Sequence, residues 1–256
     1  MIPIPYGYTG TSEFKLSKYQ YVEGADIIFD FGNPLTTGSV PTFGYASNVI
    51  TTDLPAVVLN LTSQNPGGTP TIGDGGVGGV CNFLFAGNPF ATWNYGLTAA
   101  QTTIVFFKPD NFHETAGMPA AGNNLGANTQ NALQMQTFLS GGNYIVSSSV
   151  FNSAGDTNPV RLNAAVDRTS YGGWTMAALS TNGSNLHQFW QNNATGSTST
   201  TSISRGSSGR DLKTFGKMPS QNAGISGDLI AILQYPRQLT QREIKQTFQL
   251  FKQRLP

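Results

Sequence analysis

Cysteine and histidine are almost absent from this chain of 256 residues, which contains only Cys81, His113 and His187. A single cysteine excludes an intramolecular disulfide bond and a zinc site built from cysteines. Two histidines supply no cluster of imidazole ligands, and scattered acidic residues such as Asp74 and Asp156 are explained by turn chemistry rather than calcium binding. We therefore expect no metal or other cofactor, and we interpret Cys81 as a small buried thiol.

Charged residues and long apolar runs are scarce as well. Charged residues make up 11% of the chain, and 14 basic against 13 acidic residues give a net charge of +1. A protein with so small a net charge has no strong electric field to attract nucleic acid or an acidic lipid surface. No run of about 18 apolar residues is present, and the N-terminus lacks the pattern of a signal peptide. We expect no nucleic-acid partner, no membrane insertion, and synthesis in the cytoplasm without a standard export signal.

Glycine, asparagine, serine and threonine are abundant instead, with 30 glycines alone. This composition is typical of many short strands joined by turns. Aromatic residues form 11% of the chain and hydrophobic residues 38%, which is enough for a substantial core. The sequence predicts one all-β domain, an antiparallel β-sandwich, over residues 21–256.

Several segments carry the alternating or continuously apolar pattern of strands, and turns rich in Gly, Pro and Asn separate them. They are residues 25–31, 47–52, 56–61, 102–108, 133–139, 143–151, 161–166, 174–181, 186–191 and 227–235. Segment 102–108 is apolar in its middle and ends at Pro109, as a central strand covered on both faces would. Asn182 and Gly183 predict a tight hairpin turn with positive φ values. Residues 65–79 predict a surface loop, and the polar tract 194–209 fits either an edge strand or a loop.

Residues 1–20 predict an extended arm, because prolines and glycines interrupt any ladder of strand hydrogen bonds. Such an arm can lie on a neighbouring molecule, be draped over its own domain, or be a frayed terminus. In the first case the assembly contacts would come from Ile2, Pro3, Ile4, Pro5, Tyr6 and Tyr8.

One short amphipathic helix is predicted at the C-terminus, over residues 240–255. Thr240 is a suitable N-cap, and Glu243 three residues later completes a capping box. Leu239 and Ile244 are placed as a hydrophobic staple. Apolar residues then recur at intervals of three and four, which predicts that one stripe of the helix lies on the sandwich.

The strand, turn and capped helix at the C-terminus resemble the corresponding signature of concanavalin A-like (laminin G-like) jelly-roll domains, found in many phage and bacterial proteins. The residues that carry the resemblance are Gly227, Ile230, Ala231, Tyr235, Leu239, Thr240 and Glu243. The run from Ile104 to Pro109 also resembles the central strand of that family. The resemblance implies a jelly-roll sandwich, but such domains serve as lectins, glycosidases, adhesins and virion parts alike.

Catalytic carboxylates are not evident. Some glycosidases with this fold carry Glu-x-Asp-x-x-Glu on one strand, because two carboxylates must flank the sugar bond. This chain lacks that motif, and its glutamates are Glu13, Glu23, Glu114 and Glu243. Only Glu114, beside His113, suggests acid and base chemistry, and a polar loop after Pro109 explains both residues. We expect the protein not to be an enzyme. The alternative hypothesis, a glycoside hydrolase, predicts that Glu114→Gln abolishes its activity.

Aromatic residues are the remaining indication of a ligand, because sugar rings stack their apolar faces on exposed Trp and Tyr side chains. The candidates are Trp93, Tyr95, Tyr171, Trp174 and Trp190. The three tryptophans lie in or beside predicted strands, where core packing is the alternative. We predict Trp93, Tyr95 and Tyr171 as the glycan contacts.

Two functional hypotheses follow. The first is a structural component of a bacteriophage virion, such as a head decoration, fibre or tail protein, that assembles with other virion proteins and with itself, for example as a trimer. It rests on the family resemblance, the low charge, the proline-rich arm, the lack of a signal peptide and the absence of catalytic groups. The alternative is a carbohydrate-binding module, a lectin or adhesin that recognises a host surface polysaccharide.

Overall fold

The computed structural model describes residues 21–31, 45–47, 58–63, 71–73, 80–83, 89–94, 98–111, 118–122, 133–140, 143–153, 159–165, 170–206, 212–215 and 226–255. The predicted arm, residues 1–20, lies outside these ranges, and so do the assembly contacts predicted for Ile2, Pro3, Ile4, Pro5, Tyr6 and Tyr8. No helix among the described residues combines the length and the apolar character needed to cross a membrane.

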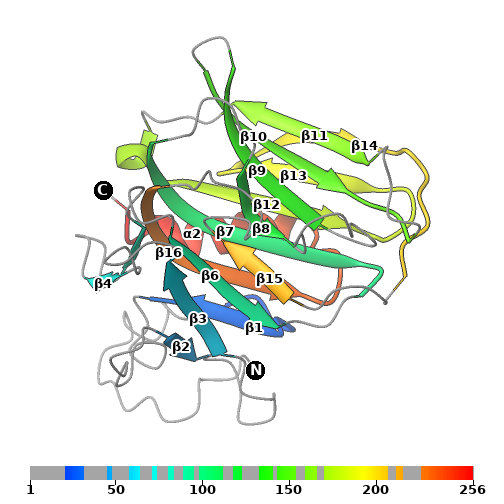
Figure 1. Ribbon diagram of the computed structural model, residues 1–256. Coiled ribbons are helices and arrows are strands. Elements are labelled where there is room, and N and C mark those ends of the chain that lie inside the picture. The colour runs from blue at the N-terminus through cyan, green and yellow to red at the C-terminus, as the bar shows by residue number, and fades with distance from the viewer. Residues whose placement is uncertain are drawn as a thin grey trace.

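Two antiparallel sheets form the body of the molecule (Figure 1). Sheet A contains β1 (Ile27–Asp30), β4 (Thr71–Gly73), β5 (Val80–Phe83), β7 (Gln101–Asn111), β12 (Thr175–Thr181), β13 (His187–Gln191), β14 (Ala194–Ser199) and β16 (Ser226–Tyr235). Sheet B contains β2 (Tyr45–Ser47), β3 (Val58–Ser63), β6 (Pro89–Asn94), β8 (Met118–Gly122), β9 (Leu133–Ser140), β10 (Asn143–Val150), β11 (Val160–Ala165) and β15 (Leu212–Phe215). The predicted all-β sandwich is confirmed.

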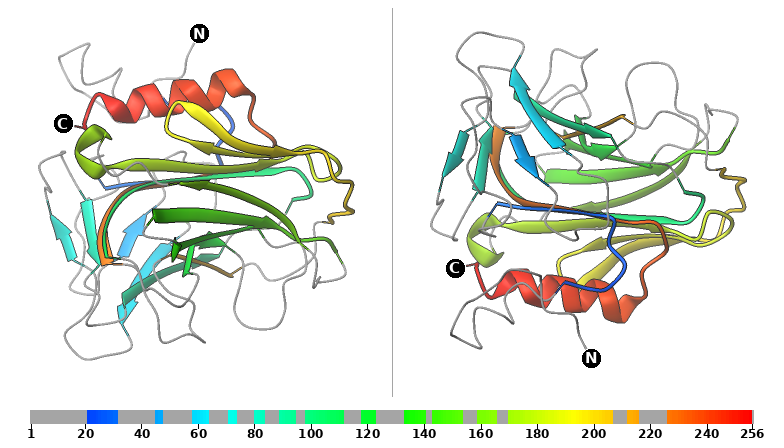
Figure 2. Two further views of the ribbon diagram at one scale, coloured as in Figure 1. Left: turned by 90° about the horizontal axis from the view of Figure 1, so that it is seen from above. Right: turned by 90° about the horizontal axis from the view of Figure 1, so that it is seen from below.

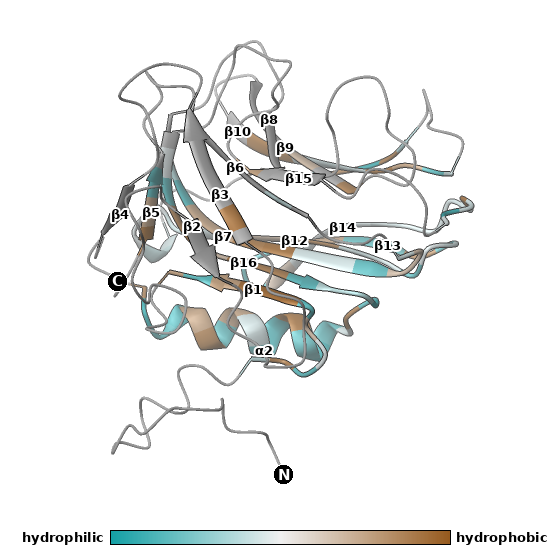
Figure 3. Ribbon diagram, turned by 60° about the horizontal axis from the view of Figure 1, so that its bottom comes forward, coloured by the Kyte–Doolittle hydropathy of each residue, from teal (hydrophilic) through white to brown (hydrophobic). Residues whose placement is uncertain are grey.

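Helix α2 (Gln241–Lys252) lies along the outer face of sheet A, opposite sheet B (Figure 2). Thr240 is the N-cap, and its side chain and that of Glu243 bond to each other's backbone, which confirms the predicted capping box. The buried residues of the helix are Ile244, Thr247, Phe248, Leu250 and Phe251. Figure 3 shows hydrophobic and hydrophilic residues alternating along α2, as expected for a helix with one apolar face.

Two hydrophobic clusters fill the spaces between these layers. The first lies between the sheets and includes Val105, Phe107, Leu179 and Phe189 from sheet A. The second lies between sheet A and α2; its members include Ile104, Phe106, Trp174, Met176, Trp190, Ile230, Phe248 and Phe251. Successive residues of β7 alternate between the two clusters because strand side chains point to opposite faces. The prediction that this strand is covered on both faces is confirmed.

Strand β7 is longer than predicted, because it continues through Pro109 to Asn111. Proline cannot donate to a strand ladder, so strands usually avoid it. Here Pro109 pairs with Gly227 of β16, and the register shifts between Ser226 and Gly227. This bulge accommodates a residue without an N–H group.

Short strands account for the other differences from prediction. Strand β4 lies inside residues 65–79, which we expected to be a loop, and β5, β6, β8 and β15 were not predicted. The polar tract 194–209 begins with the edge strand β14, so the edge-strand alternative is correct for residues 194–199.

The edge strand β14 also contacts sheet B. Gly196 of β14 faces Ala164 of β11 so closely that a Cβ atom on Gly196 would lie 2.8 Å from the Ala164 methyl.

The turn between β12 and β13 is wider than the predicted tight hairpin. Only Gly183 has a positive φ, of 80°. The Asn182 side chain instead accepts bonds from the backbone of Ser184, Asn185 and Leu186 at 2.9 to 3.0 Å. This is the local turn chemistry of asparagine, which replaces a second residue in the left-handed region.

Candidate functional site

Titratable side chains do not gather into a metal-binding cluster in the part of the chain that the structure describes. No group of three or more His, Cys, Asp or Glu residues that could hold a metal ion is present there. Cys81 is fully buried, and burial raises the pKa of its thiol above the ordinary value. Glu243 is the N3 residue of the capping box of α2. The predicted pair His113 and Glu114 lies outside the described residues.

The three tryptophans are all buried. Trp93 is 1% exposed, and its Nε1 donates to Oε1 of Gln234 at 2.7 Å across the sandwich. The prediction that Trp93 stacks on a sugar is therefore wrong, because its ring is covered on both faces by the core. Trp174 and Trp190 lie in the cluster beneath α2, which confirms the core alternative for them. Tyr95 lies outside the described residues.

Tyr171 is the predicted glycan contact that the structure leaves partly at the surface. It lies in the short 3-10 segment η2 (Ser170–Gly173), with φ 52° and ψ 35°. This left-handed conformation costs an L residue roughly 1–2 kcal/mol. Gly172 and Gly173 also have positive φ, and the amide of Trp174 donates to the Tyr171 carbonyl at 3.1 Å, which closes the turn.

Helix α2 supports the Tyr171 ring. The ring meets Phe248 edge to face, with centroids 5.3 Å apart. Nζ of Lys252, one turn further along the helix, lies 5.5 Å from the centre of the Tyr171 ring. At this distance the ammonium is attracted to the face of the ring. A positive charge therefore lies over a partly exposed aromatic ring at the C-terminal end of α2.

The basic residues of α2 continue from this point along the helix. Lys245 follows Arg242 by three residues and Lys252 follows Lys245 by seven, so these residues lie on one side of the helix. Arg242 and Lys252 are exposed, and Lys245 is partly exposed. Because a helix rises 1.5 Å per residue, Arg242 and Lys252 are about 15 Å apart along its axis. We call these three residues the basic stripe.

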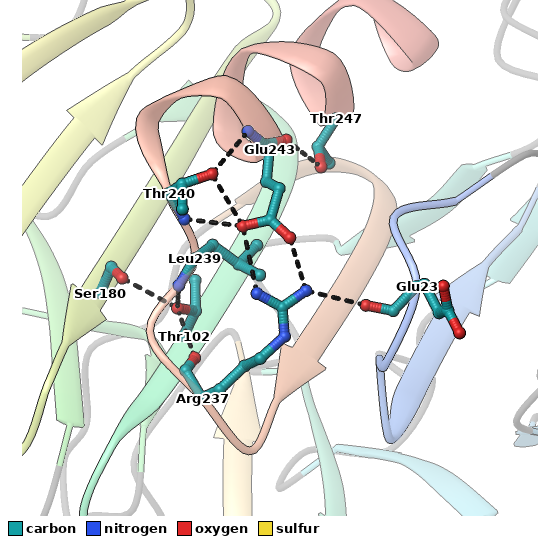
Figure 4. A network of polar contacts seen from close by, with 8 residues as sticks. All are labelled: Glu23, Thr102, Ser180, Arg237, Leu239, Thr240, Glu243 and Thr247. Atoms are coloured by element: carbon teal, nitrogen blue, oxygen red, sulfur yellow. Dashed lines mark hydrogen bonds and ion pairs between the residues drawn. The ribbon is translucent and has the colours of Figure 1, made fainter.

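Glu243 is the only acidic residue of α2, and Arg237 neutralises it (Figure 4). The guanidinium donates to both carboxylate oxygens, at 2.6 and 3.1 Å. This pairing, with the bonds from Thr240, lowers the pKa of Glu243 to about 2. Arg237 also donates to the carbonyl of Glu23 at 2.9 Å. The basic stripe therefore has no free carboxylate on its own helix.

The N-terminal end of α2 is attached to sheet A through Thr102. Its hydroxyl donates to the carbonyl of Arg237 at 2.9 Å and accepts from the amide of Leu239 at 3.0 Å. Ser180 of β12 is a third partner, at 2.9 Å. These bonds come from the two central strands β7 and β12, so the start of the helix is fixed to the middle of the sheet (Figure 4).

The C-terminal end is attached through a buried ion pair. Nη1 of Arg254 donates to Asp30 of β1 at 2.6 Å, and each side chain is 1% exposed. Tyr21 donates to the other carboxylate oxygen at 2.8 Å. We call Tyr21, Asp30 and Arg254 the ion-pair cluster. Since both ends of α2 are tied to sheet A, the helix holds Tyr171 and the basic stripe in fixed relative positions.

A second buried polar group, the imidazole cluster, lies where β12 turns into β13. Nε2 of His187 is 3.0 Å from the carbonyl of Thr201, which can only accept, so Nε2 carries the proton. Nδ1 then accepts from the Thr181 hydroxyl at 2.8 Å, and that oxygen accepts from the amide of Gly183 at 2.9 Å. Burial lowers the pKa of His187, and the charge of Arg205 lowers it further. The cluster, Thr181, Gly183, His187, Thr201 and Arg205, therefore contains a neutral imidazole.

Gln101 lies beside the imidazole cluster, opposite Thr181 in the strand register. Its side chain is 1% exposed, and neither its amide nitrogen nor its oxygen has a partner among the described residues. Nη1 of Arg205 donates to the carbonyls of Thr98 and Ala99 just before this residue. Gln101 and Arg205 are buried, whereas Thr98 and Ala99 are partly exposed.

Comparison with solved structures identifies the fold. Domain 4 of AbnA, an extracellular arabinanase of Geobacillus stearothermophilus solved in complex with arabinotriose, has a TM-score of 0.57 at 16% identity, over 88% of this chain and 98% of that domain. The fold is a lectin-like β-sandwich. Comparison with family models finds no match, and comparison with curated proteins finds none.

Toxin binding domains share the same fold. Botulinum neurotoxin type C, from a study of its interaction with two ganglioside molecules, has a TM-score of 0.59 at 9% identity, over 94% of this chain. The binding domain of Paraclostridial mosquitocidal protein 1 has a TM-score of 0.56 at 12% identity, over 88% of this chain. The chain spans about half the length of these proteins, 53% and 52% respectively.

Proposed function

We propose that this protein is a carbohydrate-binding module. The observation that carries the proposal is the similarity to AbnA domain 4, because it covers 98% of a domain that was solved with a trisaccharide. The similarity thus extends over nearly the whole of the domain that was solved with the sugar.

Tyr171 supplies the sugar-binding surface in this proposal. Sugars stack on rigid, partly exposed aromatic rings, and Tyr171 is held rigidly by Phe248 and by the turn of η2. Its left-handed backbone is strained, and strain in a structure is often retained where it positions a functional side chain. Tyr95 stays a prediction as a second contact.

The proposal is tested by a glycan array followed by isothermal titration calorimetry with the best ligand. We expect wild-type protein to bind at least one oligosaccharide, Tyr171→Phe to retain binding, and Tyr171→Gly to weaken it about tenfold. Glycine suits the left-handed backbone, so the variant removes the ring without straining the turn. Absence of binding by folded wild-type protein to every glycan at millimolar concentration would overturn the proposal.

A structural role in a bacteriophage virion is the second candidate, and it rests on the resemblance of the segment from Gly227 to Glu243 to jelly-roll domains that occur in phage as well as bacterial proteins. A carbohydrate-binding module in a virion fibre would combine both roles, with other virion proteins and its own copies as partners. The native mass of the purified protein, and its binding to particles that lack it, test this role. A monomer that does not bind such particles would contradict it.

A further inference from the structure

We propose that the glycan bound by this module is anionic, and that it lies across α2 from the Tyr171 ring along the basic stripe. This inference rests on the proposed function and names the chemical class of its ligand. The shared chemistry is a sugar that bears a carboxylate or a sulfate group.

The first argument is the contact between Tyr171 and Lys252. The ammonium lies 5.5 Å from the centre of the ring. An acidic sugar presents an apolar ring face and a negative group on one residue. When the exposed Lys252 side chain turns from the ring to the negative group, the ring of Tyr171 can take the apolar face of the sugar, so a single acidic sugar residue satisfies both side chains. A neutral sugar on the ring would displace the ammonium from it and would offer no negative group in return.

The second argument is the direction and length of the basic stripe. Lys245 and Arg242 continue from Lys252 toward the N-terminal end of the helix, over about 15 Å. Repeating negative groups on a polysaccharide can pair with successive cations at this spacing. Glu243 does not compete, because Arg237 holds both of its carboxylate oxygens.

The third argument is the contrast between the small net charge of the whole chain and the local positive charge of α2. The whole chain has a net charge of only +1, so a long-range field does not gather polyanions in general. The positive charge of α2 acts over a short range and beside an aromatic surface. This arrangement selects a glycan that carries the charge rather than any polyanion.

The test is calorimetric titration of the full chain with polygalacturonate, dextran sulfate, neutral dextran and inorganic polyphosphate, at low and physiological salt. We expect the carboxylated or the sulfated glycan to bind at least about tenfold more tightly than dextran and polyphosphate, a difference of about 1.4 kcal/mol. Which of the two glycans binds more tightly identifies the acidic group. Equal binding of polyphosphate and the acidic glycans would overturn the inference.

Variants separate this inference from the proposed function. We expect Lys252→Gln to weaken binding of the acidic glycan about three- to tenfold. The double variant that carries Arg242→Gln and Lys245→Gln should reduce the salt dependence of this binding. Arg161→Gln removes an exposed charge from sheet B, is a matched control, and should bind as wild type does. If a glycan binds but the three α2 substitutions have no effect, the proposed function stands and this inference fails.

Discussion

The ion-pair cluster and the imidazole cluster attach different parts of the chain to sheet A by different physical means. In the ion-pair cluster two opposite charges, each 1% exposed, join the end of α2 to β1. In the imidazole cluster an uncharged His187, also buried, joins the turn after β12 to the segment around Thr201. The first is therefore sensitive to the loss of a partner, and the second to the gain of a proton.

Removal of one partner of the ion pair should have the largest effect. Arg254→Ala leaves the buried carboxylate of Asp30 with Tyr21 but without its counter-charge, and we expect a loss of about 3–5 kcal/mol in the free energy of unfolding. Chemical denaturation measures this loss. Gln253→Ala, an exposed neighbour, is the control. A loss below about 1 kcal/mol in Arg254→Ala would show that the pair does not anchor the helix.

Gly183→Ala should have the next largest effect on stability, because the added methyl group of this cluster residue clashes with a neighbouring segment. The residue has φ 80°, and a Cβ atom would lie 2.6 Å from the Ala99 carbonyl. The strained backbone and the clash together predict a loss of about 2–4 kcal/mol by denaturation. Ser184→Ala, the exposed next residue, should change stability by less than about 0.5 kcal/mol. Similar stability of both variants would contradict the close approach of these segments.

The pH dependence of stability tests the imidazole cluster. The pKa of His187 is lowered on folding from its ordinary value of 6.5, so the unfolded chain binds a proton at a higher pH than the folded chain does. Stability is therefore complete above that ordinary value and falls as the pH decreases through it. Denaturation between about pH 5 and 8 measures the slope. His187→Gln should flatten this slope and His113→Gln should not; the reverse result would assign the effect to the other histidine.

The smallest expected effect concerns the support of the Tyr171 ring. Tyr171→Gly loses contact with Phe248 but relieves the left-handed backbone, so its stability should stay within about 1 kcal/mol of wild type. Tyr171→Ala loses the same contact and keeps the strain, and should be less stable than Tyr171→Gly by about 1 kcal/mol. Thermal or chemical unfolding of the pair checks this. A more stable Ala variant would show that the turn is not strained.

Much of the fold could be predicted because its signals are local. The continuous apolar run around Phe106 predicts a central strand, and the pair Thr240 and Glu243 predicts the start of α2. Strands such as β4 and β8 were missed because they are short and lie among glycines and prolines, where pairing with neighbouring strands decides the structure.

The candidate site could be predicted only in part, because its partners are distant in the sequence. Tyr171 was identified by residue type, but its contact with Lys252 depends on how α2 returns over sheet A. Trp93 was wrongly placed at the surface, since its partner Gln234 is 141 residues away. The pairing of Asp30 with Arg254 spans 224 residues and has no local signal.

Hydrogen exchange with and without saturating acidic glycan tests the central claim most directly, because it locates the bound surface on the intact chain. We predict slower amide exchange in η2 and along α2, with no change in sheet B strands β9 to β11. Protection confined to sheet B, or no protection at a glycan concentration that saturates binding, would contradict the assignment of the site to Tyr171 and the basic stripe.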